Sequence, residues 1–500
     1  MTLRNVSARF STRRVRRVAA ITATMLLGLA AAASATDWPQ LQGNAARTGR
    51  TSDSVAPPYR FHWAWMGPGN TQTSTPLSGG SSVTIGGRVQ PVVAGGRVFV
   101  GTMEGSAHGI NATTGQTLWS AAIPGGTLST AAADGSLVVF VTLRGVVHAF
   151  DTATGAAAWT YDSGYSITTS PCIDSGRVYV ANHHGDVYAL DVANGSVLWT
   201  RRVGAPVDGE IAADASAVYV PAENMYVYAL GATTGTIAAQ RRVMGQTFEG
   251  TNPMVFNGKL WVTSASAVGK GSEYAFESVL GSVTSLAQEE TVLQAFLNGD
   301  TATGGSDASA DWRHYFALNL SDLSEPFVIL SGPFEGTGHA PDSMVADNAG
   351  RVLGYFKTKF PTLTRANGNV FGTSYSIDIA AVDQSTGRRI PINNGHLANN
   401  WPWETDNLYQ MSVAGTYLWL HQRFRGTQQI QLSNSTYRLV QATVENEDGA
   451  NYAGADVKYV SGSNPRPSTP QPYTDGWSAV AVSGTRLFVS EPFGIVAIGQ

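Results

Sequence analysis

The sequence of 500 residues contains one cysteine, Cys172, so no disulfide can form within the chain. Charged residues are also scarce: they make up 14% of the chain, against about 25% in typical globular proteins. We find no zinc-ligand spacing, no glycine-rich phosphate loop between a strand and a helix, and no nucleophile elbow. These absences exclude the metal, nucleotide and hydrolase sites that short motifs encode. We expect Cys172, at the start of a predicted strand, to be a small buried core residue.

Positive charge is concentrated at the beginning of the chain. Residues 1–17 carry six arginines and no acidic residue, the apolar stretch Val18–Ala33 follows, and Ala33-Ser34-Ala35 is a small-residue cleavage site. We predict that residues 1–35 are a cleaved signal peptide of either the general secretory or the twin-arginine type. The apolar stretch is too short to predict a membrane span, and no cysteine near the cleavage site offers a lipid anchor.

The remaining chain is acidic. Without the six arginines, 26 basic residues stand against 36 acidic ones, which gives a net charge of −10. Nucleic-acid-binding proteins need a basic surface, so nucleic acid is not expected as a partner. We expect an exported bacterial protein, periplasmic or secreted, without a transmembrane segment.

Glycine is abundant, at 55 residues, and it marks an internal repeat of 40 residues. Three copies share a glycine and a tryptophan at this spacing: Gly115 with Trp119, Gly155 with Trp159, and Gly195 with Trp199. Asp151 and Asp191 open the same turn in the second and third copies, where an aspartate can bond to backbone two residues on. Strand-like segments with this period predict a β-propeller with one blade per repeat. The large indole rings are expected to fill the spaces between blades.

We predict an all-β fold for residues 36–500: one eight-bladed propeller of four-stranded antiparallel blades. Ala497-Ile498-Gly499 repeats only the start of the motif, so the last blade lacks its outer strand. The strand Arg60–Trp65 is predicted to complete that blade and close the ring, which removes an exposed sheet edge.

A helical insertion, residues 265–313, is predicted in blade five. Ser285 with Gln288 is expected to form a capping box, and Asn298-Gly299 is a stop signal. The insertion connects the second and third strands of its blade, so it leaves the ring on the side where each inner strand begins. Long loops on a rigid scaffold often carry binding sites. We call this side the loop-rich face and expect it to be functional.

Polar and aromatic residues precede the inner strands on this face. The candidate ligand-binding residues are Asp208, Glu210, Glu249, His339, Asp342, Trp401, Trp403, Glu404, Asp406, Asp475 and Trp477. Carboxylates that converge on a channel mouth can hold Ca²⁺, and tryptophans can stack on a sugar or a planar ring. The alternative is that the carboxylates form a polar rim and the tryptophans pack within the blades. The sequence leaves both open.

The repeat Ala-x-Asp-x-x-Thr-Gly-x-x-x-Trp is matched at every fixed position by Ala149–Trp159. It resembles the tryptophan-docking repeat of eight-bladed propellers of the pyrroloquinoline-quinone (PQQ) type. Blade four departs from it, with Gly231 in place of Asp and Ala239 in place of Trp. Trp38-Pro-Gln40 also looks like the lead-in of exported members. The resemblance implies the propeller fold over nearly the whole chain after the signal peptide.

For function, the resemblance implies two alternatives. The quinone-dependent alcohol dehydrogenases carry an adjacent cysteine pair and the quinohaem members a Cys-x-x-Cys-His segment, and this chain has neither. Other members are non-catalytic scaffolds, among them the lipoprotein that helps to assemble outer-membrane barrels. We predict an exported binding or scaffold protein for a protein or saccharide ligand, with no catalytic residue and no cofactor. The alternative is an oxidoreductase acting on alcohols or sugars with PQQ or Ca²⁺ in the channel.

Overall fold

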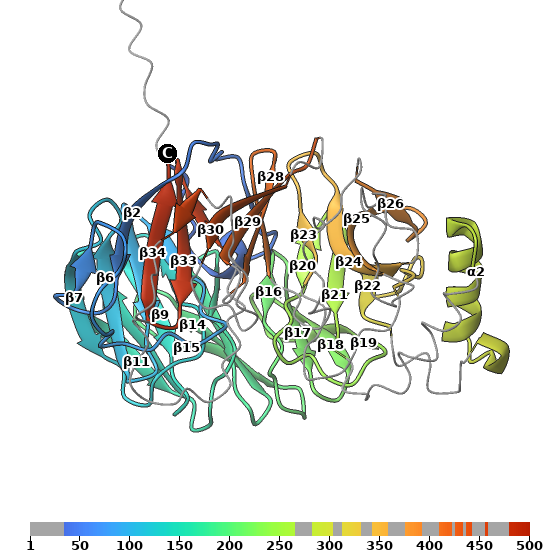
Figure 1. Cartoon of the computed structure of the whole chain (residues 1–500). Coiled ribbons are helices and arrows are strands. Elements are labelled where there is room, and N and C mark those ends of the chain that lie inside the picture. The colour runs from blue at the N-terminus through green and yellow to red at the C-terminus, as the bar shows by residue number, and fades with distance from the viewer. Residues whose placement is uncertain are drawn as a thin grey trace, which may run out of the picture. The chain divides into compact units, whose positions relative to one another are not determined.

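Eight β-sheets follow one another along the chain, and each adds strands outwards from an inner strand (Figure 1). In this computed structural model the described residues are 35–265, 283–303, 313–331, 343–358, 376–392, 410–422, 426–433, 437–442, 456–458 and 480–500. Residues 35–500 form one unit, and the predicted signal peptide lies almost entirely outside the described residues. Inner strands of neighbouring blades contact one another, including β32 (Ala481–Ser483) with β4 (Val92–Ala94). The predicted eight-bladed propeller is confirmed.

Blades one to four repeat one antiparallel unit every 40 residues. Blade one contains β4, β5 (Arg97–Gly101), β6 (Ser106–Asn111) and β7 (Thr117–Ala122), and blade two contains β8 (Ala132–Asp134), β9 (Leu137–Val141), β10 (Val146–Asp151) and β11 (Ala157–Asp162). Blade three contains β12 (Cys172–Asp174), β13 (Arg177–Ala181), β14 (Asp186–Asp191) and β15 (Val197–Arg202), and blade four contains β16 (Ala212–Ala213), β17 (Ala217–Ala222), β18 (Tyr226–Gly231) and β19 (Ile237–Arg242). Their middle strands are rich in valine and aromatic residues, which favour strands buried on both faces.

Blades five and six are less regular. Blade five contains β20 (Met254–Phe256), β21 (Lys259–Thr263) and β22 (Tyr315–Asn319), and blade six contains β23 (Val345–Ala346), β24 (Val352–Thr358), β25 (Ser376–Val382) and β26 (Arg389–Pro391). Four strands were predicted in each blade, but blade five has three strands among its described residues. A single bridge between Phe316 and Val328 stands in place of its outer strand.

Blades seven and eight gain strands from other parts of the chain. Blade seven contains β27 (Met411–Ala414), β28 (Tyr417–Gln422), β29 (Gly426–Gln431) and β30 (Tyr437–Ala442), with β1 (Arg50–Thr51) at its inner edge and β31 (Val457–Lys458) at its outer edge. Blade eight contains β32, β33 (Arg486–Glu491) and β34 (Gly494–Gly499), followed outwards by β2 (Arg60–Trp65) and β3 (Thr71–Gln72). The prediction that Arg60–Trp65 completes blade eight is therefore confirmed.

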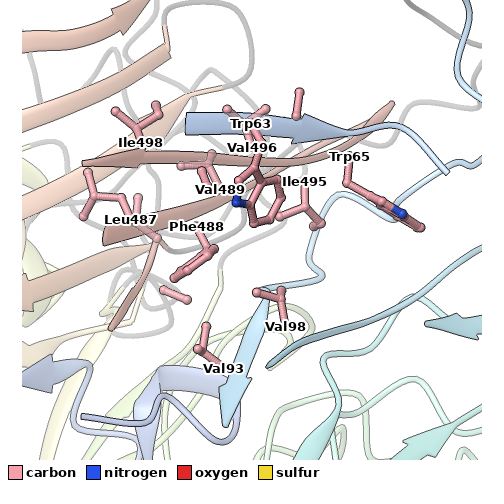
Figure 2. Close-up of a cluster of buried hydrophobic side chains, with 14 of the residues drawn as sticks. Trp63, Trp65, Val93, Val98, Leu487, Phe488, Val489, Ile495, Val496 and Ile498 are labelled. Atoms are coloured by element: carbon pink, nitrogen blue, oxygen red, sulfur yellow. The ribbon is translucent and has the colours of Figure 1, made fainter. Parts of the chain in front are cut away.

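The junction between blades eight and one is a tightly packed core (Figure 2). Trp63 of β2 is 1% exposed and packs with Phe488, while Val93 and Val98 of blade one belong to the same buried cluster. The indole N–H of Trp63 donates to the carbonyl of Ala112 in blade one at 3.3 Å. Burial of such apolar surface is the dominant stabilising term in folding. The N-terminal strand therefore joins the last blade to the first.

Each tryptophan of the repeat packs on the turn glycine of the next blade. A Cβ atom added to Gly195 would lie 2.5 Å from the ring of Trp159, and one added to Gly155 would lie 2.6 Å from the ring of Trp119. The indole N–H of Trp159 donates to the carbonyl of Val192 at 2.9 Å. Gly195 has a φ of 73°, which side-chain-bearing residues rarely adopt. Glycine is thus required twice, for the backbone conformation and for the close approach of the ring.

The aspartates of the repeat shape these turns. Asp151 Oδ1 accepts hydrogen bonds from the backbone N–H groups of Ala153 and Thr154 and from the Thr154 hydroxyl. These hydrogen bonds lower the pKa of the Asp151 carboxyl. Asp191 accepts the equivalent bond from the backbone N–H of Ala193. The turn holds the next glycine where the neighbouring tryptophan can reach it.

The segment Trp38–Thr51, which we name the threading segment, runs along the inner edges of seven blades in order. It includes the short 3₁₀ turn η1 (Leu41–Gly43). Its backbone, or the side chain of Gln40, forms hydrogen bonds with one residue of each inner strand: Val93, Ala133, Ile173, Ala213, Val255, Ala346 and Val413. Among the described residues, no inner strand has a strand neighbour on its channel side except β27, which pairs with β1 of this segment. These contacts therefore satisfy backbone groups that would otherwise face the channel.

Arg47 fixes the threading segment at the centre of the ring. Its side chain is fully buried and donates to three backbone carbonyls, those of Ile211 at 2.9 Å, Leu41 at 2.9 Å and Pro171 at 3.1 Å. A buried charge is tolerated only when its donors are satisfied. Cys172 lies beside the same segment, is buried and free as expected, and burial raises the pKa of its thiol to about 11.

The helix of the insertion lies at the outer edge of the ring. Helix α2 (Leu286–Leu297) begins after Ser285, whose side chain accepts a hydrogen bond from the N–H of Gln288, and is capped at its end by Asn298. Its Glu290 lies 3.7 Å from Arg388, beside β26, and Figure 1 shows the helix at that margin. The predicted start and stop signals are confirmed, and the insertion extends beyond the loop-rich face. A second 3₁₀ turn, η2 (Thr301–Thr303), follows the helix.

Candidate functional site

In each of blades one to seven, one inner-strand residue forms a hydrogen bond with the threading segment, and the residue three positions before it in the sequence is polar. We name these seven residues the polar collar: Gln90, Thr130, Ser170, Glu210, Asn252, Ser343 and Gln410. All but Glu210 are buried, and Glu210 is half-buried. Because each precedes an inner strand, the collar lies around the axis towards the loop-rich face. Glu210 is the collar member that the sequence predicted as a site residue.

Hydrogen bonds connect the first four collar residues in chain order. The backbone N–H of Gln90 donates to Thr130 Oγ1 at 2.9 Å, and that of Thr130 donates to Ser170 Oγ at 3.1 Å. The N–H and the hydroxyl of Ser170 then donate to the two carboxylate oxygens of Glu210, at 2.7 Å and 3.0 Å. Short hydroxyl side chains suit this position because they reach the backbone of the preceding blade. The collar thus ties adjacent blades together near the axis.

Glu210 is the charged member of the collar. Burial raises the pKa of its carboxyl, while the positive charge of Arg47 and the hydrogen bonds from Ser170 act in the opposite direction. Both of its oxygens already accept hydrogen bonds from the neighbouring blade. Its role in this structure is to anchor blade three to blade four.

Amide groups at the same level have unpaired atoms among the described residues. Gln42 of the threading segment and Asn252 of the collar each have a side-chain oxygen and nitrogen without a partner, and Gln90 has an unpaired Nε2. Gln42 and Gln90 are in contact, since the N–H of Gln42 donates to Gln90 Oε1 at 2.8 Å. Buried polar groups of this kind commonly bind ordered water.

An ion pair crosses the axis above the collar. Arg88 precedes the inner strand of blade one and Glu249 precedes that of blade five, so they come from opposite sides of an eight-bladed ring. Arg88 Nη2 lies 3.4 Å from Glu249 Oε1, and a Cβ atom added to Gly250 would lie 2.8 Å from the Arg88 guanidinium carbon. The Arg88 side chain therefore spans the channel on the loop-rich face.

Asp208 is held further out on the same face. Its Oδ1 accepts a hydrogen bond from the Thr168 hydroxyl at 2.9 Å and lies 3.1 Å from His183 Nδ1. The imidazole of His183 is exposed, with 58% of the side chain accessible. Asp208 thus positions an exposed histidine of blade three.

A second histidine of blade three lies in an exposed stack. The rings of Tyr165 and His184 are 4.1 Å apart at an angle of 13°. Arg202 Nη2 lies 2.6 Å from His184 Nε2, and Asp186 Oδ2 lies 2.8 Å from His184 Nδ1. A guanidinium can only donate, so Nε2 accepts and the Nδ1–H donates to Asp186. Both imidazole nitrogens are engaged, which leaves this histidine no free nitrogen for a metal or a proton transfer.

The remaining candidate residues lie outside the described residues: His339, Asp342, Trp401, Trp403, Glu404, Asp406, Asp475 and Trp477. Their roles stay predictions. The sequence missed the collar, although its first four members repeat at 40-residue spacing. It also missed Arg88, whose equivalents at 40-residue spacing are Leu128, Thr168 and Asp208, so that the position shows no repeated residue type.

The described carboxylates do not fit a Ca²⁺ site. Asp208 and Glu210 accept hydrogen bonds from protein donors, and Glu249 pairs with Arg88. A calcium ion needs six to eight oxygen ligands, several of them usually carboxylates. No group of three or more His, Cys, Asp or Glu side chains in the described ranges is arranged to hold a metal ion. These carboxylates are instead engaged by donors of the chain itself.

The repeat, the closed ring and the docking of tryptophans on turn glycines together define a structural family. The family model described as outer membrane protein assembly factor BamB (PQQ_2) matches residues 46–284, which span blades one to four and the start of blade five. Residues 46–284 thus belong to the PQQ-repeat β-propeller family. The propeller continues beyond the matched residues, because β23 to β34 complete the ring.

Solved structures share the fold of this PQQ-repeat propeller. BamB from Moraxella catarrhalis is 16% identical, with a TM-score of 0.50 over 85% of this chain and 99% of that chain. The quinohemoprotein alcohol dehydrogenase from Comamonas testosteroni is 12% identical, with a TM-score of 0.52 over 93% and 80%. At these identities the likeness shows the fold alone. No curated protein matches the chain, and within its described residues no helix has the length and hydropathy to cross a bilayer.

Proposed function

We propose that this PQQ-repeat propeller is an exported binding or scaffold protein that holds a protein partner on its loop-rich face. The supporting observation is that the described charged side chains near the axis on that face are already paired within the chain. Arg88 spans the channel to Glu249, and Glu210 and Asp208 accept hydrogen bonds from their own chain. These charged side chains are therefore paired within the chain, and exposed groups such as His183 remain for contact with a partner.

A protein partner also agrees with the family model that matches residues 46–284, whose description names an assembly factor for outer membrane proteins. The six arginines and apolar stretch at the beginning of the chain support export by the secretory or twin-arginine route. A saccharide ligand would rest on Trp401, Trp403 and Trp477, which lie outside the described residues.

Site-specific photocrosslinking in the source cells tests this proposal. A benzophenone amino acid placed at His183, on the loop-rich face, is expected to give a discrete crosslink to another protein. The same group at Thr154, in an exposed turn on the opposite face, is the matched control and is expected to give none. Equal crosslinking at both positions, or none at His183, would contradict the proposal.

The oxidoreductase alternative has a separate test. A ligand that binds only the folded state raises the melting temperature. We expect PQQ with Ca²⁺ to leave the melting temperature unchanged. A Ca²⁺-dependent rise that the substitution Glu210→Gln abolishes would favour the alternative.

A further inference from the structure

Blade three exposes an apolar outer edge. Val197 and Leu198 of β15 are 45% and 46% exposed, and Ile237, at the equivalent position of blade four, is 42% exposed. At the equivalent positions of blade two the side chains are Ala157 and Ala158. Isolated apolar residues on a surface are ordinary, but adjacent ones on a strand edge mark a place where another chain can bind.

The backbone of β15 is available on its outer side. Among the described residues, β15 is the outermost strand of blade three, with β14 as its neighbour. Elsewhere in this ring the equivalent edge receives a further strand: β31 pairs in parallel with β30 of blade seven, and β3 pairs with β2 of blade eight. Strand addition to an outer edge is therefore compatible with the geometry of these blades.

Basic charge follows the apolar residues along this edge. β15 of blade three ends in Arg201-Arg202, whereas β7 of blade one ends in Ala121-Ala122. Arg201 donates to the carbonyl of Gly235 and Arg202 to His184. Within the described ranges neither Arg201 nor Arg202 has a carboxylate within 4.0 Å, and the chain as a whole has a net charge of −4. The edge thus carries a local excess of positive charge.

We propose that the outer edge of blade three binds an extended strand of a protein partner, with apolar residues opposite Val197 and Leu198 and acidic residues opposite Arg202. Backbone hydrogen bonds to β15 supply the affinity, and the apolar and charged pairs supply the register. A second copy of this chain fits less well, because β15 contains no acidic residue to meet the arginines.

Synthetic peptides test this inference by fluorescence anisotropy with the full chain. The probe is a labelled ten-residue peptide with alternating valines in one half and glutamates in the other. Two control peptides carry lysine in place of glutamate, or N-methylated backbone amides on the pairing side. We expect saturable binding of the probe, and at least about tenfold weaker binding of both controls, since each lacks one kind of cross-strand interaction.

Three substitutions locate the site. Leu198→Lys and Arg202→Glu are expected to weaken binding of the probe about tenfold, and Ala158→Lys at the matching position of blade two is expected to leave it unchanged. All three side chains are exposed, so unchanged circular dichroism melts will show that the variants fold. Absence of saturable probe binding, equal binding of either control peptide, an equal effect of Ala158→Lys, or a dimer that Leu198→Lys dissociates would overturn the inference. None of these results depends on crosslinking at His183, so the two proposals can fail separately.

Discussion

The junctions that follow blades one to three solve the packing problem between blades differently from those that follow blades four and five. At the regular junctions, a tryptophan lies on the turn glycine of the next blade, as Trp199 does on Gly235. At the next junction Ala239 takes the place of the tryptophan, and Leu323 takes the place of the glycine with a φ of 56°. Leu323 is fully buried in the cluster against which Ala239 packs. At this junction Leu323 of blade five supplies the buried volume that, at the regular junctions, the indole ring of the preceding blade supplies.

The following junction shows a second solution. A Cβ atom added to Gly387 of blade six would lie 2.8 Å from the ring of Phe327, which precedes it on the irregular edge of blade five. An aromatic ring again covers a turn glycine, but it comes from a segment outside the 40-residue register. At the closure of the ring, Trp63 of blade eight again lies on a turn glycine, Gly115 of blade one. The comparison teaches that the ring requires a filled junction, and that the tryptophan repeat is one way to fill it.

The regular and irregular blades do not differ at the axis. The threading segment bonds to the inner strands of blades one to seven with N···O distances of 2.7–3.0 Å, whether the blade is regular or not. The inner ring is therefore uniform, while the outer strands and junctions vary. Four predictions test this division, from the largest expected effect to the smallest.

Deletion of residues 36–66 is expected to have the largest effect. It removes the threading segment and β2 together, so that inner edges lose their partners and blade eight loses the strand paired with β34. We expect aggregation or a large fall in melting temperature, measured by size-exclusion chromatography and thermal denaturation. A truncated protein that stays monomeric with an unchanged melt would refute the role given to both elements.

Substitutions at two junctions test the volume argument. Trp159→Ala is expected to cost about 3–5 kcal/mol of unfolding free energy, as for other buried aromatic truncations. Ala239→Trp is expected to cost about 1–3 kcal/mol, because Leu323 already fills the space.

Combining Ala239→Trp with Leu323→Gly recreates the regular junction, so the double variant is expected to be more stable than the sum of the single effects predicts. Denaturant unfolding measures all four proteins. Strict additivity would show that Ala239 and Leu323 do not share one site.

Blade one has a buried histidine, His108, at a position where blades three and four have tyrosine, so we expect its contribution to unfolding free energy to depend on pH. Burial lowers the pKa of His108 to about 4, below the value of about 6.5 expected in the unfolded chain. The unfolded chain therefore binds the proton more readily, and the contribution of His108 to stability is complete above pH 6.5 and is lost as the pH falls towards 4. Blades three and four have Tyr188 and Tyr228 at this position.

His108→Tyr is expected to make the loss of unfolding free energy below pH 6.5 shallower by about 1 kcal/mol per pH unit. Denaturant unfolding at several values between pH 7 and pH 5 provides the measurement. Tyr188→His is the reciprocal control and should make the loss steeper. An unchanged slope in both variants would show that these positions do not titrate differently in the folded and unfolded chain.

Arg88→Ala is expected to have the smallest effect on stability. The Arg88–Glu249 pair is partly exposed, and exposed pairs contribute about 0–1 kcal/mol. We expect a change in unfolding free energy within that range, measured beside Glu249→Gln as the matched variant. A loss as large as that of Trp159→Ala would mean that this pair holds the ring together in the way the junctions do.

Sequence alone predicted the elements whose side chains repeat. Trp119 and Gly155 mark the blades, and Arg60–Trp65 is a strand by composition, so the ring and its closure followed. The threading segment was not predicted, because it acts largely through backbone carbonyls such as those of Ala45 and Ala46, which any residue provides. Of the candidate site, the described carboxylates lie near the axis, but their partners come from neighbouring blades and no local pattern reveals those contacts.

The threading segment also sets the order in which the molecule can be completed. Gly49 is made early in synthesis, yet it bonds to Val413, which is made late. Contacts so distant in sequence form slowly, because a long stretch of chain must first be ordered. The segment can be fully seated only after the seventh blade exists, and a ring short of blades would leave its last residues without partners. The threading segment is therefore synthesised early but completes its contacts last. Its full set of hydrogen bonds can form only when all seven of these blades are present.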